Sequence, residues 1–310
     1  MPDEESRWLV LGARGTVGTA LSKVSLPDEV KATFLGRTDC RVDNPRDVRG
    51  ALEMYEPNLV INCAAWTDVN GAEHNRELAW RANSVGPAVV SGEISSSFPR
   101  TRLIHLSSDY VFGAVADSRS PRVESDSPSP MSVYGASKLA GERAVRHLLP
   151  DRSVIIRTSW IYGPSPTDFI GKMIAKALTG RAVEVPRDQW GSPTFVLDVA
   201  EAIEQVGRLA ILPEPPTGLL HLANEGATSR FELARAVFEE VGVDVGLVKG
   251  VWTLPNPGFA RRPHWSPLAS ERIALLGLKP LRNWSDALRH AIARYLADGA
   301  PQVAGVTSAP

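Results

Sequence analysis

A tyrosine and a lysine stand four residues apart in the segment YGASK at 134–138, which opens a predicted helix reaching about His147. Residues i and i+4 share one helix face, so the Tyr134 phenol and the Lys138 ammonium are expected to project together. A nearby cation stabilises a phenolate, so we expect Lys138 to lower the pKa of Tyr134 and suit it to proton transfer. The same spacing also arises by chance, where both side chains simply face solvent.

Hydroxyl groups upstream favour the chemical interpretation of this pair. The predicted strand Leu103–Leu106 is followed directly by Ser107, Ser108 and Asp109. The sites of α/β proteins lie at the carboxyl ends of their strands. Ser108 or Ser107 is therefore a candidate to donate a hydrogen bond to a substrate carbonyl.

A glycine-rich loop, GARGTVG at 12–18, lies between a predicted strand at 8–11 and a helix through Leu21. Its glycines allow a tight turn, close approach of the backbone to a pyrophosphate and close packing of helix on strand. A purely structural turn is the competing interpretation, and the position at the first strand–helix junction favours a dinucleotide site.

Arginines at this junction bear on which dinucleotide is bound. Sites for NAD place an acidic residue after the second strand, where it binds the ribose 2′-hydroxyl. Here that place holds Arg37, and the glycine loop itself carries Arg14. Two guanidinium groups favour a 2′-phosphate, so NADPH is the expected cofactor and NADH the alternative. Both arginines could instead be simply solvated.

The elements that must position these residues follow a strand–helix alternation. Short apolar runs separated by helical patterns lie at 8–11, 32–35, 59–63, 102–106 and 154–157. Runs that are apolar throughout, rather than alternating, predict a parallel sheet buried on both faces. We therefore predict an α/β fold, a Rossmann-type doubly wound parallel sheet with helices on both sides.

The pattern changes after Gly163. Asp168 is a predicted helix cap, and Ser229 with Glu232 forms a predicted capping box. We predict a dinucleotide-binding domain at 1–163, completed by about 196–223, and a smaller α+β substrate-binding domain made of 164–195 and 224–297. The small, polar segment 298–310 is predicted to be a disordered tail.

Composition excludes several other classes of protein. The 310 residues include 34 basic and 35 acidic side chains, a net charge of −1, which argues against a broad nucleic-acid surface. Cys40 and Cys63 make no disulfide framework, and no metal-ligand motif is present. No apolar run reaches the roughly 18 residues of a membrane span, and the N-terminus lacks a signal peptide. We expect a cytoplasmic protein without a membrane partner.

The sequence resembles the dTDP-4-dehydrorhamnose reductases, a family of extended short-chain dehydrogenases/reductases, over about residues 8 to 296. The motifs that carry the resemblance are GARGTVG (12–18), NCAAWTDVNGAE (62–73), SSDYVF (107–112), YGASKLAGE (134–142), RTSWIYG (157–163), DQWGSPT (188–194) and ARRPHWSPL (260–268). Several of these are specific to the family rather than to the fold.

The resemblance implies roles for individual residues. Its cofactor-binding residues here would be Gly12, Arg14, Gly15, Thr16, Val17, Gly18, Arg37, Ala65, Trp66, Thr67, Tyr134 and Lys138, with Ala65–Thr67 on the nicotinamide side. Tyr134 would be the general acid, Lys138 would hold the nicotinamide ribose, and Ser108 would take the catalytic hydroxyl position. The predicted substrate-binding residues are Ser108, Asp109, Trp160 and Arg262, with Trp160 against the deoxysugar. Asn83 matches the family's structural asparagine.

Alternatives accompany some of these roles. Arg261 and Arg262 are candidates for the substrate diphosphate, or equally for ion pairs within a loop. The chain has Arg41-Val42 where the family often has an aspartate that contacts adenine, so either this contact differs or Asp43 supplies it. HWSPL at 264–268 also departs from the family, and Trp265 is expected to reshape the sugar pocket.

The implied activity is NAD(P)H-dependent reduction of the 4-keto group of a dTDP-4-keto-6-deoxyhexose, in the first place dTDP-4-dehydro-L-rhamnose to dTDP-L-rhamnose. One alternative is a 4-ketoreductase for another dTDP-deoxysugar, such as a dihydrostreptose-type or antibiotic sugar. Another is a non-catalytic, NADP-binding regulatory subunit of the methionine adenosyltransferase type. The expected partner is the dTDP-sugar substrate, and the chain is expected to be a monomer or homodimer.

Overall fold

A computed structural model of the chain describes residues 5–113, 120–163, 165–254 and 256–297. The predicted disordered tail at 298–310 lies outside these residues. No helix within them is long and apolar enough to cross a membrane.

Six parallel strands form the central sheet, in the order β10-β5-β4-β3-β1-β2. They are β1 (Ser6–Leu11), β2 (Val30–Leu35), β3 (Leu59–Asn62), β4 (Arg102–Ser108), β5 (Ser153–Thr158) and β10 (Gly218–His221). The apolar runs found in the sequence are the cores of the first five strands, and the predicted parallel sheet is confirmed.

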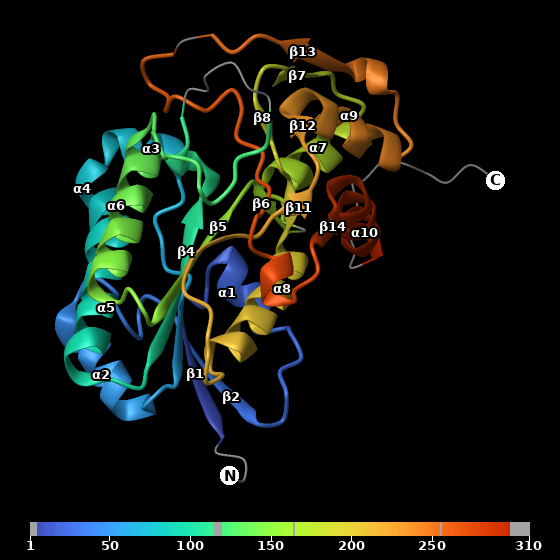
Figure 1. Cartoon of the computed structure of the whole chain (residues 1–310). Coiled ribbons are helices and arrows are strands. Elements are labelled where there is room, and N and C mark those ends of the chain that lie inside the picture. The colour runs from blue at the N-terminus through green and yellow to red at the C-terminus, as the bar shows by residue number, and fades with distance from the viewer. Residues whose placement is uncertain (1–4, 114–119, 164, 255, 298–310) are drawn as a thin grey trace.

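Helices cover both faces of this sheet (Figure 1). On one side lie α2 (Pro45–Tyr55), α5 (Gly86–Ser97) and α6 (Val133–Leu148), with the short α3 (Val69–His74) and α4 (Arg76–Trp80) beside them. On the other side lie α1 (Thr16–Leu21) and α8 (Val196–Ala210). Along β1, Leu9 and Leu11 belong to the apolar cluster with α2 and α5, while Trp8 and Val10 belong to the one with α1 and α8. The doubly wound arrangement is thus also confirmed.

The strand order reverses direction between β1 and β3. From β1 the chain crosses to β2 at one side, and it then returns to place β3 on the other side of β1. The connections that leave β1 and β3 therefore separate at the carboxyl edge of the sheet. Such a switch point opens the crevice in which α/β proteins bind ligands.

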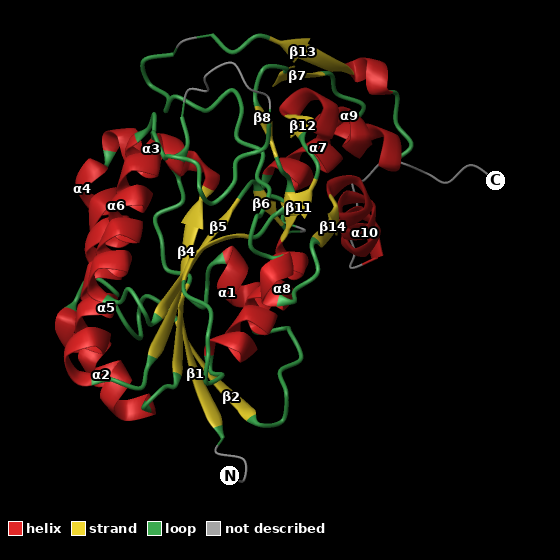
Figure 2. Cartoon of the chain, in the orientation of Figure 1, coloured by secondary structure: helices red, strands yellow, loops and turns green. Residues whose placement is uncertain are grey.

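A second group of elements lies over this carboxyl edge (Figure 2). Its helices are α7 (Phe169–Leu178), α9 (Arg230–Glu240) and α10 (Trp284–Ala297). Short strands pair within it as β7 (Val183–Pro186) with β13 (Val248–Val251), β8 (Trp190–Gly191) with β12 (Thr228–Ser229), β11 (Asn224–Glu225) with β14 (Leu281–Asn283), and β6 (Ile161–Tyr162) with β9 (Thr194–Phe195). We call this group the upper lobe. The division into two domains near residue 163 stays a prediction.

Local capping chemistry sets where several helices begin. The Asn44 side chain accepts a hydrogen bond from the second residue of α2, and Asp168 caps α7 through the Gly171 N–H. Ser229 and Glu232 form a reciprocal capping box at α9. Each side chain satisfies backbone N–H groups that have no partner within the helix. The caps at Asp168 and Ser229 were predicted from the sequence and are confirmed.

A buried ion pair fastens α6 to the sheet. Ser107 and Arg157 are register partners on β4 and β5, and both side chains meet Glu142 of α6. Arg157 donates to the Glu142 carboxylate through Nε at 2.8 Å and Nη2 at 2.6 Å, and Ser107 Oγ donates to it at 2.5 Å. Both charged side chains are only 2% exposed. The helix that carries Tyr134 and Lys138 is therefore held at one position against the strands.

Replacing Glu142 with glutamine tests this fastening. Glu142→Gln leaves the Arg157 guanidinium buried without a countercharge, so we expect the free energy of unfolding to fall by about 3–5 kcal/mol. Urea denaturation followed by circular dichroism measures the change. Arg289→Ala is the control, because Arg289 is 61% exposed and its pairs with Asp286 and Glu240 contribute at most about 1 kcal/mol. Equal effects of the two variants would contradict the assignment.

Candidate active site

A cavity of about 740 Å³ lies at the carboxyl edge of the sheet, at the switch point. It is lined from below by the loops after β1 to β4 and by α6, and from the upper lobe by Arg230. Most of the residues predicted from the sequence line it: Gly12, Arg14, Gly15, Thr16, Val17, Arg37, Ala65, Trp66, Thr67, Ser108, Asp109, Tyr134, Lys138 and Trp160. Among the predicted binding residues, Gly18, Arg261 and Arg262 do not line it.

The glycine loop forms the floor of the cavity because side chains would not fit there. Gly12 has a φ of +81°, and a Cβ at this position would stand 2.5 Å from the Ala64 backbone nitrogen. Gly15 caps α1 without a side-chain hydrogen bond, so the first turn of the helix presents N–H groups with no side-chain partner. Gly18 is buried, and a Cβ there would stand 2.5 Å from the Gly12 carbonyl oxygen. Gly18 therefore contributes to the packing of α1 against the glycine loop and does not itself line the cavity.

Tyr134 and Ser108 meet inside the cavity. Tyr134 stands in the first turn of α6, which Ser132 caps, and Ser108 is the last residue of β4. A hydrogen bond joins their hydroxyl groups. Ser108 Oγ also accepts from the Tyr110 N–H at 3.2 Å, which fixes its direction. A phenol and an aliphatic hydroxyl thus lie together at the end of a strand, where a substrate carbonyl could accept from both.

The structure corrects the expectation that Lys138 lowers the pKa of Tyr134. Burial raises the pKa of the Tyr134 phenol instead, and the nearby Asp109 raises it further. The Lys138 ammonium donates to the Leu106 carbonyl oxygen at 2.5 Å, so it is turned toward the strand. Burial lowers the pKa of Lys138 itself to about 8. Shared helix spacing does bring both residues to the cavity, but desolvation dominates their protonation.

Asn83 fastens the loop after β3 to α6. It lies in a π-helical turn, Arg81–Val85, and is fully buried. Its side-chain oxygen accepts from the Trp66 N–H at 2.8 Å, while its amide nitrogen donates to the Trp66 carbonyl at 3.1 Å and to Ser137 Oγ at 3.1 Å. The Ala65–Thr67 segment is therefore positioned through its backbone.

Asp109 joins the two lobes within the site. Ser108 Oγ donates to its Oδ1 at 3.1 Å, and Ser266 Oγ, from the upper lobe, donates to its Oδ2 at 2.7 Å. The side chain is buried, and this burial raises its pKa to about 6 despite these hydrogen bonds. Trp265 was expected to reshape the sugar pocket. It stacks on Trp190 at 5.7 Å between ring centroids, away from the lining, and its neighbour Ser266 is the residue that reaches the site.

Trp160 and Arg230 form the wall of the cavity opposite α6. Trp160 has a φ of +43°, unusual for a large side chain, and the Arg230 guanidinium lies 3.6 Å from the centroid of its ring. Arg230 is hydrogen-bonded to Tyr110, which is also hydrogen-bonded to Arg262. Arg262 thus lies beside this wall although it does not line the cavity. The pair of guanidinium groups makes the wall cationic.

Sequence reasoning missed Arg230. It stands within the predicted capping box and was interpreted only as part of a helix start. One signal was available, because the first turn of a helix disfavours a cation. An arginine at that position therefore needs another reason to be there.

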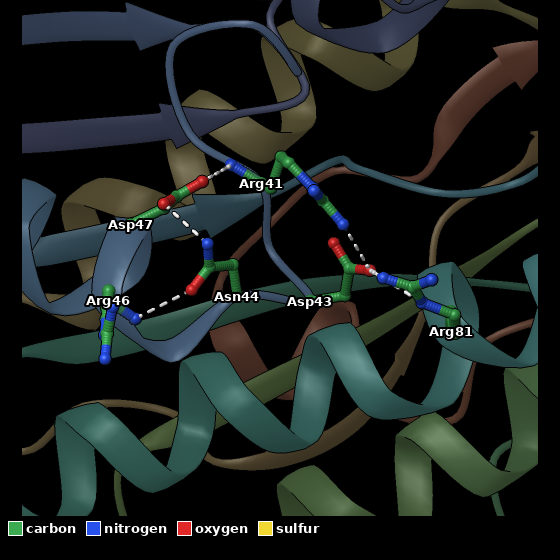
Figure 3. Close-up of polar contacts among 6 residues, drawn as sticks. All are labelled: Arg41, Asp43, Asn44, Arg46, Asp47 and Arg81. Atoms are coloured by element: carbon green, nitrogen blue, oxygen red, sulfur yellow. Dashed lines mark hydrogen bonds and ion pairs between the residues drawn. The ribbon is translucent and has the colours of Figure 1, made fainter.

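One end of the cavity lies beyond the glycine loop. Arg14 lies across Gly36 at the end of β2, since a Cβ on Gly36 would stand 2.9 Å from Arg14 Nε. Arg41, Asp43 and Arg81 line the same end (Figure 3). In the portion of the chain that the structure describes, no group of three His, Cys, Asp or Glu side chains could hold a metal ion.

Comparison with known proteins gives the context for this geometry. The family model described as the RmlD substrate binding domain matches residues 6–297. A dTDP-4-dehydrorhamnose reductase of Mycolicibacterium smegmatis is 38% identical over 288 residues, 93% of this chain and 85% of that protein. A probable dTDP-4,6-dihydroxy-2-methyloxan-3-one 4-ketoreductase of Streptomyces antibioticus is 37% identical over 94% of this chain and 96% of its own length.

Among solved structures, a dTDP-4-dehydrorhamnose reductase of Bacillus anthracis in complex with NADP superposes with a TM-score of 0.85. It is 30% identical and covers 94% of this chain and 99% of its own. The family match over nearly the whole chain, the relatives and the superposition agree with the motifs that line the cavity. The chain belongs to the dTDP-4-dehydrorhamnose reductase family.

Proposed function

We propose that this protein reduces the 4-keto group of dTDP-4-dehydro-L-rhamnose with NADPH, giving dTDP-L-rhamnose. The observation that carries the proposal is the hydrogen-bonded Tyr134–Ser108 pair, which faces a cavity between a glycine loop and a cationic wall. The names of the relatives agree with this reaction, and so does the NADP bound to the Bacillus anthracis reductase.

The residues of the cavity fit a nicotinamide dinucleotide phosphate. The loop at 12–18 would hold the pyrophosphate, because Gly12 and Gly15 leave the backbone open to it. Arg14 and Arg37 would pair with the 2′-phosphate, and Lys138 would hold the nicotinamide ribose. When bound there, NADPH supplies the hydride.

The chain's own chemistry in this reaction is the handling of one proton. Hydride transfer to C4 leaves negative charge on the substrate oxygen, and the Tyr134 phenol donates its proton to that oxygen. The Tyr134 phenol is protonated at neutral pH, which is the state a general acid needs, and its raised pKa means that it gives up the proton only to a strongly basic acceptor such as the developing alkoxide. The single Ser108 Oγ proton, which points to Asp109 in the structure, would turn to the same oxygen and donate a second hydrogen bond, so the developing charge is stabilised where it arises.

The upper lobe would bind the rest of the substrate. Trp160 offers an apolar ring for the deoxysugar, and Asp109 is an acceptor for a sugar hydroxyl. Arg230 and Arg262 would pair with the diphosphate, and Arg230 has no carboxylate ion pair among the described residues. The Asp109 carboxylate acts on Arg230 electrostatically without forming an ion pair, so a ligand anion would give this cation a direct partner.

A second candidate is reduction of a different dTDP-4-keto-6-deoxysugar. It is favoured by the Streptomyces antibioticus 4-ketoreductase, whose similarity to this chain is nearly that of the Mycolicibacterium smegmatis protein. Following NADPH oxidation with each keto-sugar separates the two candidates, because the preferred substrate has the higher kcat/KM.

Removing the phenolic hydroxyl tests the proposed acid. We expect Tyr134→Phe to lower kcat by a factor of about 100 or more, the size of a general-acid contribution. Cofactor binding should change little, so a fluorescence titration with NADPH serves as the control for folding. Near-normal turnover by this variant would rule out Tyr134 as the acid.

Truncating Arg230 tests the anion wall. We expect Arg230→Ala to raise KM for the dTDP-sugar at least about tenfold, since a charged hydrogen bond contributes about 1.5–3 kcal/mol. The matched control is Arg235→Ala on the exposed side of the same helix, which should leave KM unchanged. If both variants behave alike, Arg230 does not bind substrate.

The raised pKa of Asp109 predicts a pH dependence. Its hydrogen bonds from Ser108 and Ser266 are strongest when the carboxylate is ionised, so kcat/KM should be full above pH 6 and fall as the pH drops through about 6. In Asp109→Asn, which cannot titrate, this decline should disappear and leave a lower, flat profile between pH 5 and 7. A decline that persists in Asp109→Asn would assign it to another group.

A further inference from the structure

The end of the cavity beyond the glycine loop is rich in hydrogen-bond donors. Arg41, on the loop after β2, and Arg81, in the π-helical turn, both extend toward the carboxylate of Asp43 (Figure 3). Val42, between Arg41 and Asp43 in the chain, is buried and also lines the cavity. This end thus combines an apolar surface with a charged rim.

Both guanidinium groups use one oxygen of Asp43. Arg81 donates to Oδ2 from Nε at 3.0 Å, and its Nη2 lies 2.6 Å from the same atom. Arg41 Nη2 donates to it at 3.4 Å. The two arginines lower the pKa of Asp43, so it is ionised at neutral pH. The cluster of Arg41, Asp43 and Arg81 therefore carries a net charge of +1.

Most of the guanidinium N–H donors in this cluster are not used by Asp43. A guanidinium group has five N–H bonds, and only a few of those on Arg41 and Arg81 point at Asp43. The loop itself is held separately: Asp47 accepts from the Arg41 backbone N–H at 3.1 Å and from the Asn44 side chain at 2.8 Å. The spare donors are thus placed on a fixed loop.

The position of the cluster indicates which part of a dinucleotide it meets. The glycine loop is the pyrophosphate position, and the residues at the end of β2, where Arg14 and Arg37 lie, face the adjoining ribose. The Arg41–Asp43–Arg81 cluster follows Arg37 along the chain and lines the cavity at the same end. The next group of the cofactor is its purine base.

We propose that the Arg41–Asp43–Arg81 cluster contacts the edge of the cofactor's purine as a hydrogen-bond donor, so that this protein binds a 6-oxopurine dinucleotide at least as well as the adenine form. The inference rests on the proposed function for the identity of the cofactor class. Adenine presents an amino donor at position 6, whereas hypoxanthine presents an oxygen acceptor there. Guanidinium donors pair with the oxygen, and a carboxylate would pair with the amino group.

Two ligands test the proposal, because hypoxanthine differs from adenine at position 6 and in the proton that its lactam form carries on N1. Full-length protein is titrated with NADPH and with reduced nicotinamide hypoxanthine dinucleotide phosphate, without sugar substrate, and each Kd is measured by calorimetry. We expect the Kd for the hypoxanthine form to be equal to or lower than that for NADPH. A lower Kd for NADPH would overturn the proposal, because it would mean that the Asp43 carboxylate, which can accept from the adenine amino group, outweighs the guanidinium donors.

Variants at Arg41 test whether this residue sets the ratio of the two Kd values. Arg41→Asp replaces a donor by an acceptor, so it should shift the ratio of the two Kd values at least about tenfold toward NADPH, equivalent to one good hydrogen bond. Arg41→Ala should shift it in the same direction by less. The matched control is Arg46→Asp in the first turn of α2, an exposed residue whose backbone N–H, not its side chain, is hydrogen-bonded to Asn44, and it should leave the ratio unchanged. An unchanged ratio in Arg41→Asp would overturn the proposal.

Failure of the cofactor assignment gives a different result. Arg37→Ala should weaken both ligands equally, since both carry the 2′-phosphate, and should leave their ratio as it is. If neither ligand binds wild-type protein, the proposed function fails and the inference fails with it. If both ligands bind and only the ratio of their Kd values differs from the expected one, the proposed function stands and the inference alone is overturned.

Discussion

The bidentate ion pair between Arg157 and Glu142 is the interaction on which the rest of the site depends. Two charges removed from water must stay matched, because the loss of either partner leaves the other uncompensated in a medium of low dielectric constant. The pair, with Ser107, therefore fixes the position and the orientation of α6 against β4 and β5. Tyr134 on that helix and Ser108 on that strand can then share a hydrogen bond.

The chemistry needs both halves of the molecule. The sheet and α6 supply the proton donor, and the upper lobe supplies the wall that Trp160 and Arg230 form. Asp109 connects them, because its two oxygens accept from Ser108 on one side and Ser266 on the other. A carboxylate in that position is costly to bury, which its raised pKa reflects. Such a cost is common where a group is kept for function rather than for stability.

Local signals in the sequence were sufficient for the fold and for much of the site. Apolar runs identified the first five strands of the sheet, and the caps at Asp168 and Ser229 identified helix starts, because both kinds of signal act over a few residues. Contacts between distant segments gave no such signal. Arg230 reaches Tyr110 across 120 positions of sequence, and Arg81 reaches Asp43 across 38. The pKa of Tyr134 went in the opposite direction to the prediction because helix spacing describes neighbours, whereas burial depends on the whole fold.

The π-helical turn at Arg81–Val85 links the positions of two separate parts of the cavity. Arg81 holds Asp43 at one end of the cavity, and two residues later Asn83 holds the Trp66 backbone at another. A single turn of helix thus carries both side chains that hold these two parts of the cavity. A π turn contains one residue more than the α-helix around it. Deleting one residue from this turn would change the directions of Arg81 and Asn83, so the contacts with Asp43 and with the Trp66 backbone depend on the same short piece of chain.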